Sequence, residues 1–209
     1  NKSNDKQIIL KNSICLKNIN FQYDNKKILN DINLKIKKNS KTILIGKTGS
    51  GKSTLADIIA GYLMPTSGVV EFDNININKD TKLIWQKSIG HVSQSVPILN
   101  DDLYINIALS NNFDKKQVLA AAKHAEIHEF IMNLDNKYET ILSESGKNLS
   151  GGQIQRIGIA RALYNDPNTV IFDEGTSNLD LINERKIFET LDKLSKEKTI
   201  IIITHRIET

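Results

Sequence analysis

One segment of this 209-residue chain restricts its possible folds more than any other. Residues 46–53 have the sequence GKTGSGKS, which matches the pattern G-x-x-x-x-G-K-[S/T] at every fixed position. The apolar segment KTILIG precedes it, and KSTLADIIAGYL, which has apolar residues at helical spacing, follows it. This order predicts a buried strand, a glycine-rich turn and a helix, which together form a phosphate-binding loop.

Each part of this segment suits the binding of nucleotide phosphates. Glycines let the backbone wrap an anion and turn successive N–H groups toward it. The helix that begins near Lys52 adds partial positive charge at its N-terminus. Lys52 can neutralise the β- and γ-phosphates, and the Ser53 hydroxyl can hold Mg²⁺. The predicted nucleotide-binding residues of this segment are Gly46, Lys47, Thr48, Gly49, Ser50, Gly51, Lys52, Ser53 and Thr54.

Short apolar strands alternate with helical segments in the rest of the chain. Residues 69–73, 169–174 and 199–204 have the composition of strands, and residues 181–196 have the spacing of a helix. Buried strands joined by helices favour an α/β fold with a mostly parallel sheet that is covered on both faces.

Two regions modify this plan. Residues 14–23 and 32–36 alternate apolar and polar side chains, as half-buried strands do, and a turn is predicted at 24–27 between them. Residues 100–111 and 114–134 are helical in composition, so we expect a helical insertion between the two halves of the sheet. The apolar face of the second helical segment comprises Val118, Leu119, Ala122, Ile127, Phe130 and Ile131.

Composition excludes several classes of protein. Lys and Arg total 28 against 24 acidic residues, and this small excess is spread along the chain, so no nucleic-acid partner is expected. A single cysteine, Cys15, excludes an internal disulfide and fits a reducing compartment. No apolar run approaches the ~18 residues that span a bilayer.

The chain begins with Asn and stops just after a strand-like run, so we expect it to be cut from a longer protein.

The apolar segment VIFDE, residues 170–174, ends in two carboxylates. Because the chain turns at the end of a strand, both acids can reach one crevice. We predict that Asp173 binds Mg²⁺ beside Ser53 and that Glu174 polarises an attacking water as a general base. Solvated acids at a strand end are the simpler alternative, but a phosphate loop in the same chain favours the catalytic interpretation.

Residues 149–153, LSGGQ, precede another apolar helical run. Ser150 is suited to cap a helix, and two adjacent glycines let another molecule approach the backbone. The segment alone does not distinguish an anion site from an ordinary loop that enters a helix.

The order of these motifs carries a family resemblance. The phosphate loop, LSGGQ and VIFDE are followed by SNLD (177–180) and THR (204–206). Together they resemble the ATP-binding domain of an ABC transporter over nearly the whole chain. The resemblance implies one P-loop NTPase domain over 1–209 with an N-terminal antiparallel β subdomain. Its ATP-binding core would comprise about 1–93 and 154–209, and a helical signature subdomain would comprise about 95–153.

The resemblance also implies roles for residues outside the phosphate loop, with ATP and Mg²⁺ as the ligands. Tyr23 would stack on adenine, Gln94 would sense the γ-phosphate and Mg²⁺, and His205 would contact the γ-phosphate. The implied catalytic residues are Lys52, Gln94, Glu174 and His205. The implied Mg²⁺ ligands are Ser53, Gln94 and Asp173. Three other histidines have no register with the motifs and are expected to be structural or surface residues: His91, His124 and His128.

In proteins of this family the LSGGQ segment serves the nucleotide of a second domain. The resemblance therefore implies a closed dimer of nucleotide-binding domains, in which Asp180 lies near the interface. Closure would exclude water and aim backbone dipoles at the phosphoryl group. The residues expected to act on the partner's ATP are Ser150, Gly151, Gly152 and Gln153.

Two stretches resemble the exporter branch of the family. Glu144 takes the position of a glutamate that contacts the coupling helices of the transmembrane domain, and Asn106 and Ile107 match an Asn-Ile pair of exporters. The implied function is an ATPase that drives export or flipping of a substrate, at the cytoplasmic face of a membrane. Gly175 and Asn178 depart from the family, where alanine is common, and Gly175 adds backbone freedom beside the predicted base.

Three alternatives remain open at this point: the ATPase subunit of an ABC importer, a soluble ABC ATPase that acts outside transport, and a regulatory module without turnover. One compact cassette with weak net charge argues against the soluble ATPase. The presence of both Glu174 and His205 argues against a module without turnover.

Overall fold

The computed structural model describes residues 9–143, 146–173 and 180–205. Several residues with predicted roles lie outside these ranges: Glu144, Glu174, Gly175, Asn178 and Arg206. No helix within the described ranges is both long and apolar enough to cross a lipid bilayer.

The described strands form two sheets of four strands each. One is wholly parallel, and its order places the strand before the phosphate loop beside the last strand of the chain. In spatial order its strands are β3 (Lys41–Ile45), β8 (Thr199–Thr204), β7 (Thr169–Asp173) and β6 (Ile89–Val92). The other sheet is antiparallel and comprises β2 (Lys26–Lys37), β1 (Ser13–Tyr23), β4 (Ser67–Phe72) and β5 (Ile75–Asn76).

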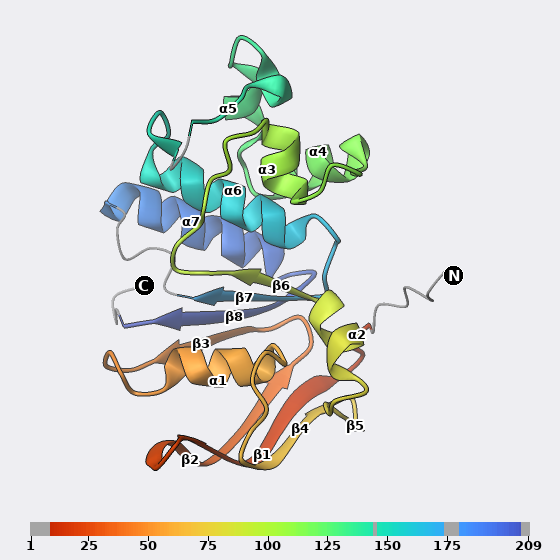
Figure 1. Ribbon diagram of the computed structural model, residues 1–209, viewed down its shortest axis with the longest axis vertical. Helices are drawn as coiled ribbons and strands as arrows, with labels where there is room; N and C mark the ends of the chain where they lie inside the picture. The colour runs from red at the N-terminus through yellow and green to blue at the C-terminus, as the bar shows by residue number, and fades with distance from the viewer. Residues whose placement is uncertain (1–8, 144–145, 174–179, 206–209) are drawn as a thin grey trace.

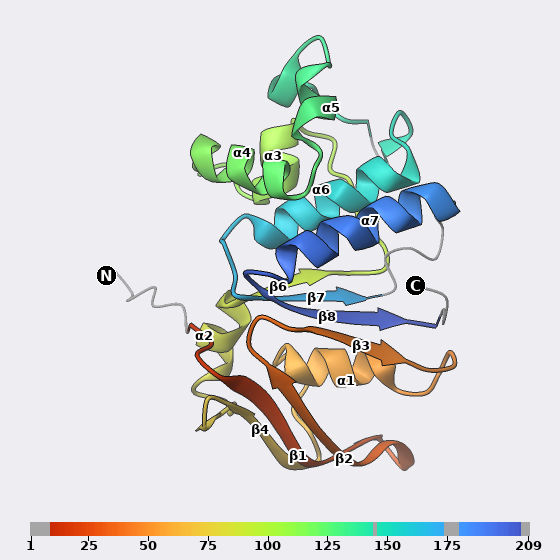
Figure 2. The ribbon, with the colours of Figure 1, turned by 180° about the vertical axis from the view of Figure 1, so that it is seen from behind.

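Helices cover both faces of the parallel sheet. Helices α6 and α7 lie on one face, and α1 lies on the other, between the two sheets (Figures 1 and 2). The long helices are α1 (Lys52–Ile59), α4 (Lys115–His124), α6 (Gly151–Leu163) and α7 (Leu181–Leu194). The short ones are α2 (Lys82–Lys87), α3 (Leu103–Ala108), α5 (His128–Met132) and a 3-10 turn at Lys137–Glu139.

The alternation of side chains along β7 divides the interior into two cores. Val170 and Phe172 pack with α6, α7 and the helical insertion, whereas Ile171 packs with α1 and the antiparallel sheet. Residues on both faces of this strand are buried, which explains its continuous apolar sequence. The second core also contains Trp85, whose indole N–H donates to the carbonyl of Ile59 at 2.6 Å.

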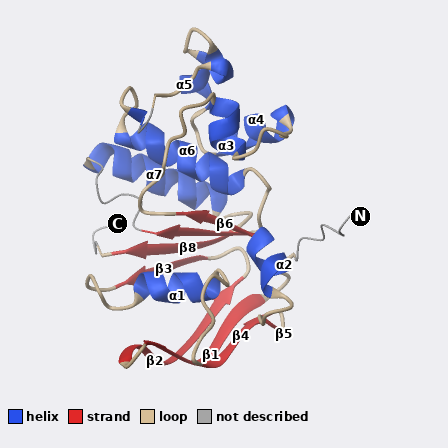
Figure 3. Cartoon of the chain, in the orientation of Figure 1, coloured by secondary structure: helices blue, strands red, loops and turns tan. Residues whose placement is uncertain are grey.

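The described part of the insertion between β6 and α6 consists of α3, α4, α5 and the 3-10 turn, joined by loops (Figure 3). The predicted apolar face of residues 114–134 is confirmed, since four of its residues are buried and Leu119 and Phe130 pack against the same core. The α/β fold class is therefore confirmed: a parallel P-loop-type sheet, an antiparallel β unit and an inserted group of helices.

Three predicted boundaries are wrong. Residues 114–134 form two helices, because Glu126 takes a left-handed conformation (φ 55°) that lets Ile127 and Ile131 turn back to the core. Helix α1 ends at Ile59 and not at residue 63, and Gly61 follows with φ 76°. Strand β2 begins at Lys26, because the turn before it has only two residues and Asp24 supplies its positive φ of 50°.

Candidate nucleotide-binding site

The phosphate loop joins the carboxyl end of β3 to α1. Gly49 and Gly51 have φ angles of 81° and 89°, which residues with a Cβ rarely adopt. A Cβ at Gly51 would also lie 2.9 Å from Leu29 Cδ2 and 3.1 Å from Ile28 Cγ2. Glycine is therefore required at Gly51 both by backbone conformation and by the hairpin that packs against it.

The N-terminus of α1 is suited to bind an anion. Its N-cap residue is Gly51, no side chain of the described chain caps it, and the dipole of the helix favours an anion at this end. Lys52 Nζ donates to the carbonyls of Gly46 at 2.8 Å and Lys47 at 3.0 Å. These hydrogen bonds hold the ammonium group over the loop, where it can exchange carbonyl contacts for phosphate contacts.

Two oxygen donors from distant segments meet beside the loop. Ser53 Oγ, on the first turn of α1, lies 3.4 Å from Asp173 Oδ1 at the end of β7. The described residues contain no group of three or more His, Cys, Asp or Glu side chains that could hold a metal ion. Mg²⁺ commonly takes only one or two protein oxygens and completes its shell with phosphates and water. The Ser53–Asp173 pair fits a Mg²⁺ ion that protein and nucleotide hold jointly.

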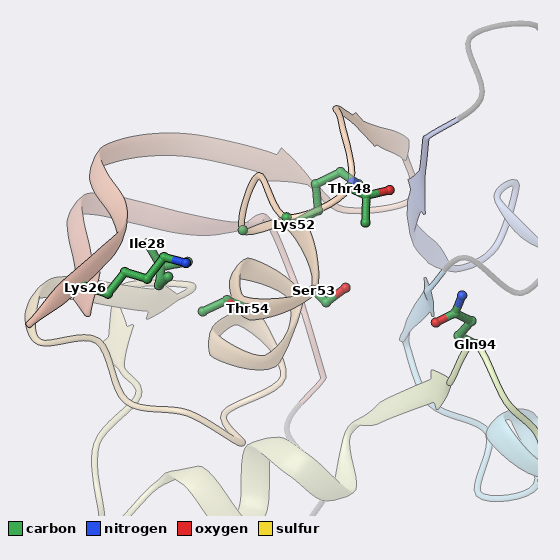
Figure 4. Close-up of a pocket in the computed structure, with 9 residues that line it drawn as sticks. Lys26, Ile28, Thr48, Lys52, Ser53, Thr54 and Gln94 are labelled. Carbon is green, nitrogen blue, oxygen red and sulfur yellow. The ribbon is translucent and has the colours of Figure 1, made fainter. Parts of the chain in front are cut away.

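A pocket of about 400 Å³ opens over the phosphate loop (Figure 4). Its predicted members come from the loop, from α1 and from the segment after β6, and β2 adds two residues that the sequence analysis did not select. The pocket is lined by Lys26, Ile28, Thr48, Gly49, Gly51, Lys52, Ser53, Thr54 and Gln94. Gln94 lies on the far side of the pocket from Lys26, across the phosphate loop (Figure 4).

Tyr23 and His205 do not line this pocket. Tyr23 ends β1 with half of its surface exposed, and its ring meets that of Phe21 edge-on at 4.8 Å. His205 is exposed and directly follows β8. The preceding residue, Thr204, pairs with Ile45, the last residue of β3. His205 and the phosphate loop therefore both follow strands that end at the same edge of the sheet.

The LSGGQ segment forms the start of α6. Ser150 is the N-cap: its hydroxyl accepts from the N–H of Gln153 at 3.3 Å, and the Gln153 side chain accepts from the N–H of Ser150 at 2.8 Å. Gly151 is exposed, whereas Gly152 is buried, and a Cβ there would meet the side chain of Asn183 at 3.2 Å. These residues do not line the pocket. Their end of α6 and the phosphate loop lie at the same end of the molecule, on opposite sides of the parallel sheet (Figure 1).

Asp180 caps the neighbouring helix α7. Its carboxylate accepts from the backbone N–H of Asn183 at 2.9 Å and from the Asn183 side chain at 2.7 Å. These hydrogen bonds hold the pKa of Asp180 below its usual value, and the bond from the backbone N–H of Asn183 has the larger effect. Asn183 thus contacts both the Asp180 cap and the start of the LSGGQ helix.

Helix α6 also holds the segment that follows β6. Gln155 Nε2 donates to the carbonyl of Gln94 at 3.4 Å, and Arg161 donates to the carbonyl of Pro97 at 3.0 Å. Gly158 gives room for Val96, because a Cβ there would lie 2.6 Å from Val96 Cγ2. The pocket residue Gln94 is therefore tied through its backbone to the helix that begins with LSGGQ.

Asn106, one of the exporter-like residues, is fully buried. Its side-chain nitrogen lies 2.9–3.1 Å from the carbonyls of Leu99, Asp101 and Asp102, and its oxygen accepts from the N–H of Leu99 at 2.9 Å. The Asn side chain fastens the loop that precedes α3, which is a structural reason for Asn at this position.

His91 is half-buried, and its ring contacts the ring of Tyr62 at 5.6 Å between centroids. Burial lowers the pKa of His91, while the charges of Asp173 and Asp57 act in the opposite direction. His128 bonds through Nδ1 to the hydroxyl of Tyr138 at 2.8 Å. Both histidines have packing partners, as a structural role requires.

Sequence patterns missed Lys26 and Ile28 as pocket residues. The available signal was the length of the turn: with only Asp24 and Asn25 between the strands, Lys26 pairs directly with Tyr23. The turn predicted from the sequence, residues 24–27, was longer and therefore did not define this pairing.

Comparison with known proteins identifies the family. The sequence model described as ABC transporter matches residues 29–177, which include the phosphate loop, LSGGQ and Asp173. The chain belongs to the ABC transporter family. The ATP-binding domains of this family hydrolyse ATP. The membership of the family that the sequence motifs predicted is therefore confirmed, and with it the class of ATP-hydrolysing domains.

Curated ABC transporter relatives include the leukotoxin translocation ATP-binding proteins LktB of Mannheimia glucosida and Bibersteinia trehalosi. Each is 41% identical over 203 residues, which cover 96% of this chain and 29% of the relative. Among solved structures, a bacterial Atm1-family ABC exporter with ATP bound has a TM-score of 0.84 and 33% identity, over 96% of this chain and 35% of that one. The chain thus spans less than a third of the length of these curated relatives.

Proposed function

We propose that this chain is the ATP-hydrolysing motor of an ABC exporter and that it works as a closed pair of nucleotide-binding domains. The main supporting observation is that Ser53 and Asp173 lie 3.4 Å apart beside the phosphate loop. The ammonium group of Lys52 lies over the same loop, bonded to the carbonyls of Gly46 and Lys47. This arrangement offers an ammonium group, helix N–H groups and metal-binding oxygens to one triphosphate.

Each proposed group has a distinct chemical task. The loop amides and Lys52 bind the β- and γ-phosphates and stabilise negative charge that develops during transfer. Ser53 and Asp173, with Gln94, hold Mg²⁺, which neutralises phosphate charge when bound. Glu174, the next residue after Asp173, polarises the attacking water. Three further tasks are assigned as follows: adenine stacking to Tyr23, γ-phosphate contact to His205, and binding of the partner's ATP to Ser150, Gly151, Gly152 and Gln153.

The hydrogen bonding of Ser150 supports a role toward a second copy. Its oxygen accepts from the N–H of Gln153, so its hydroxyl proton remains to be donated to an external acceptor. Ser150 and the adjacent Gly151 are exposed, and they do not line the pocket of their own chain. A phosphate brought by a partner domain would meet this hydroxyl and the N-terminal dipole of α6 together.

The names of the similar proteins favour export over import. The curated relatives are translocation ATP-binding proteins, and the solved structure is an exporter with ATP bound. We therefore propose a transmembrane-domain partner that contacts this chain through coupling helices, and a location at the cytoplasmic face of a membrane. The domain boundaries near residues 93, 95 and 154 belong to the same proposal.

The test is ATP hydrolysis by the full-length protein in lipid vesicles, with Glu174→Gln as the matched variant. We expect Mg²⁺-dependent phosphate release by the wild type. The variant should bind ATP and lose at least ~100-fold in turnover, because it loses the base while keeping shape and size. Unchanged turnover in the variant would contradict the assignment of Glu174, and absence of ATP binding by the wild type would contradict the proposed function.

A further inference from the structure

The hairpin of β1 and β2 places Lys26 next to Tyr23. The two residues pair directly across the antiparallel ladder, so their side chains point to the same face of the sheet. Ile28 lies at an irregularity of the same ladder and lines the same pocket as Lys26. Lys27, the residue between them, points to the opposite face.

This hairpin packs against the phosphate loop. The side chains of Ile28 and Leu29 approach Gly51 so closely that a Cβ would contact both. Lys26 and Ile28 consequently line the same pocket as the loop and the first turn of α1. In Figure 4 the Lys26 side chain extends from β2 toward α1, with Ile28 beside it.

The ammonium group of Lys26 is available to a ligand. Lys26 is exposed, and within the described ranges it forms no hydrogen bond or ion pair with the protein. Some other lysines are paired, as Lys17 is with Glu71 at 2.6 Å. A free cation on the wall of a phosphate pocket attracts an anionic ligand.

We infer that Lys26 is a nucleotide-binding residue whose ammonium group pairs with the α-phosphate. The inference rests on the proposed function, which sets the triphosphate on the loop and the adenine at Tyr23. Between these two ends lies the α-phosphate, and the pocket wall there is Ile28 and Lys26. The α-phosphate is common to ATP and ADP, so this contact strengthens the binding of both and does not distinguish them.

The chain offers a matched control for the test. Lys26→Gln and Lys27→Gln remove the same charge from adjacent exposed positions, but only Lys26 lines the pocket. Dissociation constants for ATP and for ADP are measured by calorimetry on the full-length protein at low and high salt. Thermal unfolding verifies that each variant folds, and Lys26→Arg tests rescue by a retained charge.

We expect Lys26→Gln to weaken ATP and ADP binding equally, by about 3- to 10-fold at low salt and less at high salt. Lys27→Gln should leave both constants within about 2-fold of the wild type, and Lys26→Arg should regain most of the loss. Equal constants for the two glutamine variants would overturn the inference, and so would a loss confined to ATP. Failure of the wild type to bind ATP would instead overturn the proposed function.

Discussion

Ser53 Oγ lies 3.4 Å from Asp173 Oδ1, although 120 residues separate them in sequence. The parallel sheet makes this contact possible, because β3 and β7 end at the same edge with only β8 between them. Helix α1 then starts from the β3 side and carries Ser53 back over that edge. The contact therefore depends on the fold and not on either motif alone.

Asp173→Asn tests this pair as a Mg²⁺ site. The substitution keeps the size of the side chain and removes the charge that holds the metal, so MgATP hydrolysis should fall by at least ~100-fold. Binding of ATP in the presence of EDTA should be unchanged, because the phosphate loop remains intact. Titration of activity and of ATP affinity with Mg²⁺ measures both effects. Equal Mg²⁺ dependence of variant and wild type would exclude Asp173 as a ligand.

Gly158→Ala tests the link between α6 and the segment after β6. A Cβ at Gly158 would overlap Val96 Cγ2 at 2.6 Å, and such overpacking costs about 1–3 kcal/mol. The higher helix propensity of Ala returns roughly 1 kcal/mol of that cost. Urea denaturation should therefore show a modest net loss of stability. Adding Val96→Ala should make the two substitutions less destabilising together than their sum, whereas strict additivity would mean that the two residues do not interact.

Glu126→Gln should change the pH dependence of stability. The hydrogen bond from Lys193 and, less strongly, the contacts with Thr190 and Arg156 hold the pKa of Glu126 below its usual value of 4.5. A lowered pKa in the folded state stabilises the protein above pH 4.5 and ceases to do so as the pH falls below it. The variant should be less stable by about 0.2–1 kcal/mol at pH 7, since the group is partly exposed.

This difference should shrink as the pH falls below about 4.5, where the Glu126 carboxylate is protonated first in the unfolded chain and, at lower pH, in the folded one. Urea denaturation across pH 3.5 to 7 measures the effect, and Glu129→Gln, on the exposed side of α5, is the control. A difference that stays constant with pH would show that the ion pairs of Glu126 do not stabilise the fold.

Local patterns predicted the parts of the molecule whose geometry is local. The phosphate loop, the Ser150 cap and the buried strand β7 each follow from spacing within about ten residues. The break at Glu126 escaped prediction because apolar spacing continues through it, while the turn is decided by packing of Ile127 and Ile131. Lys26 was not predicted as a pocket residue because the face on which its side chain lies depends on the exact length of the turn, and a change of one residue reverses it.

The motifs predicted that Asp173 lies beside Ser53, but they did not predict other contacts between distant segments. LSGGQ predicts the start of a helix, but the hydrogen bond from Gln155 to the Gln94 carbonyl depends on how α6 lies against β6. Asn106 was selected as a branch marker, and its burial with hydrogen bonds to the Leu99–Asp102 loop emerges only from the structure. Gln94 and Asn106 were selected from the sequence, but the residues that they contact were not.

Mixing two inactive variants tests the central claim that one copy binds ATP and a second copy completes the site. Lys52→Ala disables the phosphate loop, and Ser150→Arg blocks the surface that would cover the partner's phosphate. Each full-length variant alone should lack ATPase activity. Co-assembled, a mixed pair contains one site in which both Lys52 and Ser150 are intact, so activity should return to roughly a quarter of the wild type for random pairing. If each copy cleaved its own ATP without help, Ser150→Arg alone would keep its activity, since Ser150 does not line the pocket of its own chain. If Ser150 acted on the ATP of its own chain, every chain in the mixture would carry a defect and the mixture would remain inactive. Either result would contradict the claim.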